Sequence, residues 1–142
     1  MRKLSIIIFM LSFSNCEKHP LVNPCLTGDK DVNLIGAWKL IEECNCYNLG
    51  GDFIWKKIFE ESLLSFNEEC RVLIEASKST ICSSEGNFNS NDGKLVMVFP
   101  CPNGAISTNK YDYILSSKND TLLLKGYVDE GFIGRKFLRK KL

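Results

Sequence analysis

The stretch Leu34-Ile35-Gly36-Ala37-Trp38-Lys39-Leu40 begins the first of a series of short apolar runs. These runs are separated from one another by residues typical of turns. Runs of this length that recur about every 8–12 residues are typical of a β-sandwich or a β-barrel. Turn signals at 89–93 (Asn-Ser-Asn-Asp-Gly) and at 100–104 (Pro-Cys-Pro-Asn-Gly) support this interpretation. We therefore expect eight or nine β-strands, at residues 34–41, 53–59, 62–66, 71–76, 80–88, 94–99, 111–116, 121–127 and 132–139.

No long amphipathic helix interrupts this series, so the strands are expected to form sequential antiparallel hairpins. The segment 53–59 is ambiguous, because two isoleucines have helical spacing whereas Phe53, Trp55 and Phe59 fit a strand. We expect a strand there. A meander of eight strands can close on itself and thereby remove its exposed edges. The predicted fold class is all-β: a single eight-stranded up-and-down antiparallel barrel.

Three local features of this predicted domain resemble the lipocalin family. Gly36 and Trp38 match its opening Gly-x-Trp, and residues 108–113 are loosely similar to its Thr-Asp-Tyr motif. Arg139, for which Arg135 is a competitor, lies in a segment similar to the closing strand. The resemblance implies that Trp38 plugs the closed end and that an arginine lies over its ring, a contact that the ring face favours. The sequence is most similar to the small lipocalin-like domain of bacterial envelope lipoproteins.

The first residues have the layout of a secretory signal peptide, with a basic start followed by an apolar run over 4–13. That run is shorter than the about 20 residues that a membrane span needs. Ser14-Asn15-Cys16 resembles a relaxed form of the lipobox of bacterial lipoproteins, which implies that Cys16 becomes a lipidated N-terminus. The alternative is an ordinary cleaved signal with Cys16 as a structural cysteine. We expect a lipid-anchored protein of the bacterial cell envelope, with the outer membrane favoured, facing the periplasm or the cell surface.

The 142 residues therefore divide into a signal peptide (1–15), a lipidated N-terminus with a tether (16–32) and a lipocalin-like barrel domain (33–142). The only histidine, His19, belongs to the tether. Cleavage removes Arg2 and Lys3 and no acid, which leaves 16 basic and 17 acidic side chains. Such a balanced charge excludes nucleic acid as an expected partner. The expected partner is the membrane, through the lipid, and the sequence names no protein partner.

The sequence does not predict an enzyme, a cofactor or a metal site. A lone histidine argues against mechanisms built on a Cys–His or Ser–His pair. The acids at 42–43, 60–61 and 68–69 are adjacent pairs, and neighbours in a strand point to opposite faces. They are therefore not placed to act together on one bond.

Six cysteines remain once Cys16 is assigned to the lipid: Cys25, Cys44, Cys46, Cys70, Cys82 and Cys101. An even number in an exported chain predicts disulfides, although the spacing does not choose among the pairings. We expect Cys44 and Cys46 to have separate partners, and Cys82 to pair with Cys101 across a hairpin. The alternative is zinc, which prefers Cys-x₂₋₄-Cys pairs that this chain lacks.

An eight-stranded barrel is wide enough to be filled by its own side chains or to hold one small ligand. The residues that could line a pocket are large and apolar: Phe53, Trp55, Phe66, Met97, Phe99, Tyr111 and Tyr113. We predict a domain that binds a small hydrophobic or amphiphilic ligand in the envelope. In the alternative, these residues fill the core, and the chain is an anchored protein-interaction or inhibitor domain that acts through the segments 44–51 and 100–109.

Overall fold

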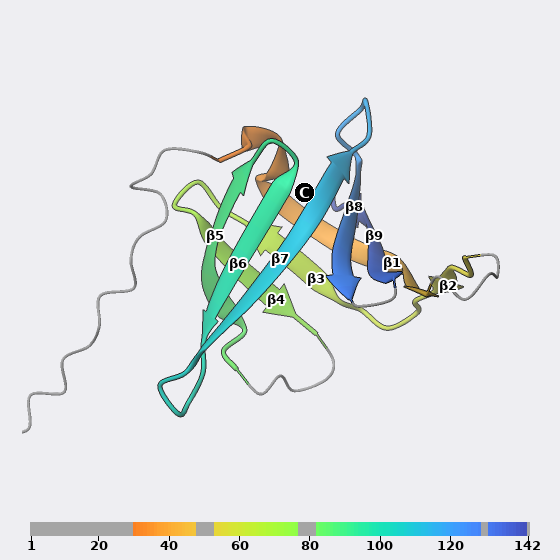
Figure 1. Ribbon diagram of the computed structural model, residues 1–142. Helices are drawn as coiled ribbons and strands as arrows, with labels where there is room; N and C mark the ends of the chain where they lie inside the picture. The colour runs from red at the N-terminus through yellow and green to blue at the C-terminus, as the bar shows by residue number, and fades with distance from the viewer. Residues whose placement is uncertain (1–29, 48–52, 77–81, 129–130, 142) are drawn as a thin grey trace, which may run out of the picture.

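The computed structural model describes residues 30–47, 53–76, 82–128 and 131–141 (Figure 1). Its strands are β1 (Gly36–Tyr47), β2 (Lys56–Lys57), β3 (Leu63–Phe66), β4 (Arg71–Glu75), β5 (Glu85–Asn91), β6 (Lys94–Pro100), β7 (Ile106–Leu115), β8 (Thr121–Val128) and β9 (Gly131–Arg139). Consecutive strands from β3 to β9 pair antiparallel, and β1 pairs with both β3 and β9. The predicted fold is confirmed: a closed eight-stranded up-and-down barrel, with β2 as one additional short strand.

The core of the barrel follows the alternation of its strands. In β6, the side chains of Leu95, Met97 and Phe99 are buried, and the residues between them are less so. The predicted hairpin between β5 and β6 turns at Asp92 and Gly93, both with positive φ, as a two-residue turn requires. The buried cluster contains Leu34, Trp38, Leu40, Leu64, Phe66, Cys70, Val72, Phe88, Leu95, Met97, Phe99, Tyr113, Leu122, Leu124 and Phe137.

Trp38 closes one end of the barrel. Its side chain is fully buried, and its Nε1 donates a hydrogen bond of 2.8 Å to the carbonyl of Leu34, in the 3₁₀ turn η2 (Val32–Leu34). The guanidinium of Arg139 lies 4.2 Å from the centre of the Trp38 ring. Gly36 has a φ of 129°, and a Cβ there would lie 2.9 Å from Nη1 of Arg139. Glycine is therefore needed at this position by both the backbone and the arginine.

Arg139 also fastens three backbone segments together. Its Nε donates to the carbonyl of Asn119 at 2.7 Å, and its Nη1 to that of Ile35 at 2.7 Å. Its Nη2 donates to the carbonyl of Asn33. Because each of these bonds has a charged donor, the cluster stabilises more than neutral hydrogen bonds of the same number would. The last strand is thereby fixed to η2 and to the turn between β7 and β8.

A second contact fixes the N-terminal segment to the closed end. The hydroxyl of Tyr113 donates to a carboxylate oxygen of Asp31 at 2.9 Å, and the Asp31 amide donates to the hydroxyl of Ser90 at 2.7 Å. Burial, and then the bond to Asp31, raise the pKa of Tyr113 to about 12. Asp31, which precedes the expected domain 33–142, is thereby joined to the barrel. The predicted signal peptide, Cys16, His19 and Cys25 lie outside the described residues.

A β-bulge divides β1 into two halves that present opposite faces to the interior. The register against β9 shifts between Leu40 and Glu42, so that Ile41 is the extra residue. Before the bulge, Trp38 and Leu40 face the core. After it, Glu43 faces inward with Arg135, whereas Glu42 makes an ion pair with Lys136 on the outer face.

The segment 53–59 is not the barrel strand that we expected. Only Lys56 and Lys57 pair, opposite Glu43 and Glu42 of β1, on the same edge whose residues 36–39 pair with β3. Phe53, Ile54 and Phe59 are exposed, by 52%, 71% and 91%. We call residues 53–59 the outer strap.

The outer strap covers the outside of the wall that β1 and β9 form. The Trp55 ring lies so close to Gly134 that a Cβ there would be 2.6 Å from it. The rings of Phe53 and Phe132 are 5.4 Å apart, and the Lys136 ammonium lies 4.9 Å from the Trp55 ring centre. Phe53 and Trp55 therefore pack on the outer wall and not in the barrel.

Two disulfides are described, and one of them corrects an expectation. Cys44 pairs directly with Cys46, with their Cα atoms 5.4 Å apart. The predicted separate partners are wrong, because residues two apart in a strand point to the same face, and these two are both buried. Cys82 pairs with Cys101, as predicted, and Cys70 is also disulfide-bonded. In the described part of the chain, no three potential metal ligands cluster.

No helix in the described ranges has the length and apolar composition that a membrane span requires.

We expect Arg139→Met to lower the free energy of unfolding by about 2 kcal/mol, because it removes three charged hydrogen bonds and the contact with the Trp38 ring. Urea unfolding measures the change. Lys140→Met, at the exposed neighbouring residue, is the matched control and should stay within about 0.5 kcal/mol. Equal effects of the two substitutions would contradict the assigned role of Arg139.

Tyr113 should make stability fall with rising pH between about pH 10 and about 12. In the unfolded chain its hydroxyl ionises near pH 10, whereas the folded protein keeps it protonated until about pH 12. The contribution is therefore complete below pH 10 and is lost as pH rises. The difference between the urea midpoints of the wild type and Tyr113→Phe should be constant below about pH 10 and should shrink steadily as the pH rises toward about 12. A constant difference would show that Tyr113 has an ordinary pKa.

Candidate ligand site between β7 and β8

Strands β7 and β8 separate over part of their length. Their ladder runs from the pair Leu115–Leu122 to the pair Asp112–Lys125 and stops there, although β7 begins at Ile106 and β8 continues to Val128. Figure 1 shows the two strands diverging below their shared turn. Because both stretches are described throughout, this is a split in the barrel wall.

A cavity of about 240 Å³ lies at the split. Its lining comes from both faces of the wall, because strand alternation places Tyr111 and Arg135 on the inner face and Thr108, Lys110 and Tyr127 on the outer face. The lining residues are Thr108, Asn109, Lys110, Tyr111, Gly126, Tyr127, Val128, Ile133 and Arg135. A molecule in this cavity can therefore contact groups inside the barrel while it remains accessible from the side.

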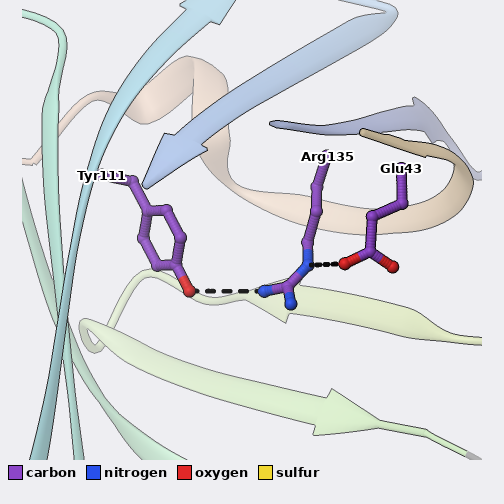
Figure 2. Close-up of polar contacts among 3 residues, drawn as sticks. All are labelled: Glu43, Tyr111 and Arg135. Carbon is purple, nitrogen blue, oxygen red and sulfur yellow. Dashed lines mark hydrogen bonds and ion pairs between the residues drawn. The ribbon is translucent and has the colours of Figure 1, made fainter. Parts of the chain in front are cut away.

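Arg135 is the polar centre of this site. It projects from β9 between Glu43 of β1 and Tyr111 of β7, as Figure 2 shows. Its Nε donates to Oε1 of Glu43 at 3.3 Å, and its Nη1 donates to the hydroxyl of Tyr111 at 3.4 Å. About a third of each charged side chain is exposed, so the ion pair adds little to stability. The contacts position the guanidinium between β7 and β9.

Gly126 permits the close approach of Tyr111 to β8. A Cβ on Gly126 would lie 3.1 Å from the Tyr111 ring, closer than an ordinary contact. A larger residue would push the ring toward the cavity or out of the split. The pair therefore sets the width of the site on its inner side.

Asp112 marks the point where the strands part. Its carboxylate pairs with Lys94 of β6 and accepts a hydrogen bond from the Tyr127 hydroxyl of β8. The hydrogen bond from Lys94, and then that from Tyr127, lower the pKa of Asp112. The same carboxylate raises the pKa of Tyr127. These contacts hold three strands together on the outer face at the end of the split.

The pocket predicted from sequence is found only in part. Tyr111 lines the cavity, but four other candidates belong to the core: Phe66, Met97, Phe99 and Tyr113. Of these four, Phe66 and Tyr113 also border hollows near the closed end. The remaining two, Phe53 and Trp55, belong to the outer strap. The barrel is therefore filled with side chains on the side of Trp38, and space remains at the split.

Sequence reasoning missed most of the residues at this site, including Arg135, Glu43 and Lys110. Arg135 could have been found, because it alternates with Phe137 and Arg139 and so shares their inner face. Glu43 faces inward because of the bulge at Ile41, and no residue pattern in β1 predicts that bulge.

The two segments proposed as interaction loops are corrected as well. Residues 44–47 belong to β1, and 48–51 lie outside the described residues. Of the second segment, Pro100 ends β6 and residues 106–109 begin β7, where Thr108 and Asn109 line the cavity.

Two other hollows, of about 380 and 420 Å³, lie near the closed end. The first surrounds the turn at Asn67, and the second surrounds the contact between Asp31 and Tyr113. The polar groups that define them already hold turns and the N-terminal segment in place. The split is thus the better candidate for a ligand.

A scan against protein-family models finds no match, and a search of curated proteins finds none. Among solved structures, a mutant of the fluorescent protein UnaG matches with a TM-score of 0.45 and 14% identity, over 78% of this chain and 98% of that one. A redesigned β-barrel matches with a TM-score of 0.41 and 11% identity, over 77% and 93%. The function of the split therefore has to be argued from its own residues.

Proposed function

We propose that this chain is a membrane-anchored, lipocalin-like lipoprotein that binds a small amphiphilic ligand in the cell envelope. The observation that carries the binding proposal is the placement of Arg135 at a cavity in the barrel wall, where Glu43 and Tyr111 position it. Apolar groups of Val128 and Ile133 line the same cavity. A concave site with a few convergent polar groups on an apolar wall is typical of small-molecule binding.

The size of the cavity limits the ligand. Its volume of about 240 Å³ is below the roughly 300–1,000 Å³ that is usual for drug-sized ligands. The side of the barrel closed by Trp38 adds no space, because large side chains such as Phe88 and Leu122 fill it. The site therefore suits a compact molecule, or the polar end of a longer one.

We propose that the chain binds its ligand and does not catalyse a reaction on it. The adjacent acids Glu42 and Glu43 lie on opposite faces, each in an ion pair with a different basic residue. They therefore do not form the paired carboxylates that acid–base chemistry on one bond would use.

One observation favours a second candidate, an anchored protein-interaction domain. The outer strap exposes three large apolar side chains, Phe53, Ile54 and Phe59, within seven residues, and apolar groups that gather at a surface are typical of protein-interaction sites. Recovery of one specific partner by crosslinking, lost when Phe59 is replaced by Ser, would support this candidate.

The anchoring part of the proposal rests on the N-terminal sequence. Cys16→Ser should release the protein from the membrane fraction and abolish fatty-acid labelling, because the thiol that would carry the lipid is removed. Cys25→Ser is the matched control and should leave both unchanged. Labelling that survives Cys16→Ser would contradict lipidation at this residue.

Native mass spectrometry of protein purified from its own envelope should reveal one retained small molecule per chain. Gly126→Leu should reduce its occupancy about tenfold, because the new side chain meets the Tyr111 ring and fills the split. Ser117→Leu, in the exposed turn after β7, is the size-matched control and should retain the ligand. The binding proposal would fail if the wild type retained no molecule and also did not bind a fluorescent fatty acid.

A further inference from the structure

The charged residues that line the cavity all have one sign. The Asp112 carboxylate, at the end of the split, pairs with Lys94 and is not a lining residue. Arg135 and Lys110 are the ionisable residues with positive charge among the nine lining residues, and no carboxylate belongs to that set. Glu43 contacts the Nε side of Arg135 without lining the cavity. The cavity therefore presents two cations to whatever occupies it, while the glutamate orients one of them from behind.

Arg135 keeps donors for a ligand. A guanidinium has five N–H groups, and the two contacts within the described part of the chain engage Nε and Nη1 (Figure 2). The remaining N–H groups can bind an oxyanion, for which the planar fork of arginine is well matched. Because the surrounding protein excludes part of the solvent, such a bond is stronger there than in open water.

The apolar part of the lining is compact. Ile133, Val128 and the Tyr111 ring flank the charged groups, with the ring held against Gly126. In a volume of about 240 Å³ there is room for an apolar body of the size of a ring system but not for a long enclosed chain. An occupant that uses the whole cavity thus combines an anionic group with a compact apolar body.

From this we infer that the split binds a small organic acid, which reaches it through the side of the barrel. Its carboxylate, sulfonate or phosphate lies between Arg135 and Lys110, and its apolar body lies against Tyr111 and Ile133. The inference rests on the proposed binding function and narrows it to a class of ligand and to a place in the wall.

Two fluorescent probes with the same apolar body test the charge requirement. Anilinonaphthalene sulfonate carries an anionic group that N-phenylnaphthylamine lacks. The sulfonate should bind at least about tenfold more tightly, and Arg135→Gln and Lys110→Gln should each reduce this preference. In both variants the sulfonate should lose more affinity than the neutral probe does. Lys140→Gln, which removes an exposed charge away from the cavity, is the control and should change neither affinity.

A matched pair of tryptophan variants tests whether the ligand binds at the split. Thr108 and Ile114 are both exposed on the outer face of β7, but Thr108 borders the split whereas Ile114 lies where β7 is paired with β8. Thr108→Trp should weaken the binding of both probes about tenfold by covering the outer side of the split. Ile114→Trp should have no effect.

The possible results distinguish a wrong ligand class or a wrong site from a wrong binding function. Equal affinity for the two probes would overturn the organic acid and leave a neutral ligand site. A preference for the sulfonate that Arg135→Gln and Thr108→Trp leave intact would overturn the location. If neither probe bound and the purified protein retained no native molecule, the binding function itself would be wrong.

Discussion

The guanidinium of Arg139 joins the last strand of the barrel to the segment that leads into the first strand, and the closed end of the barrel depends on this contact. It covers the buried Trp38 ring and donates to carbonyls of the N-terminal segment and of the turn between β7 and β8. Gly36 is required because a side chain there would collide with the arginine. With the first and last strands fixed in this way, the meander closes and has no free edges at this end.

The bulge at Ile41 changes which residues of β1 face the interior of the barrel. It reverses which residues of β1 face inward, so that an acid enters the interior beside Arg135 while the Cys44–Cys46 disulfide is turned away from the core. The outer strap then covers the wall on the outside, with Trp55 against Gly134. The single inserted residue thus lies between the apolar, filled part of the barrel around Trp38 and the more polar part around Arg135, where the cavity lies.

The split between β7 and β8 is where that space opens to solvent. A closed barrel that is filled on one side can bind a ligand only where its wall or its open end admits one. Here the ladder ends at Asp112, and Tyr111 and Arg135 become accessible from the side. The cations at the split lie in a chain whose overall charge is nearly balanced, so the local arrangement and not the net charge selects the ligand.

Alternation and turn residues were enough to predict the strand series and the closed barrel, because both depend on residues close in sequence. The arginine over Trp38 was implied only by the resemblance to lipocalins. The alternation of residues in β9 would also have predicted that Arg135 faces inward. The bulge, the outer position of residues 53–59, the Cys44–Cys46 pairing and the split were decided only by tertiary structure. The bulge depends on the register of β1 against β9, the position of residues 53–59 on pairing at the other edge of β1, and the split on where the β7–β8 ladder stops. Hydrogen bonding between distant segments determines all three, and the Cys44–Cys46 pairing follows from the face that these two residues share in β1.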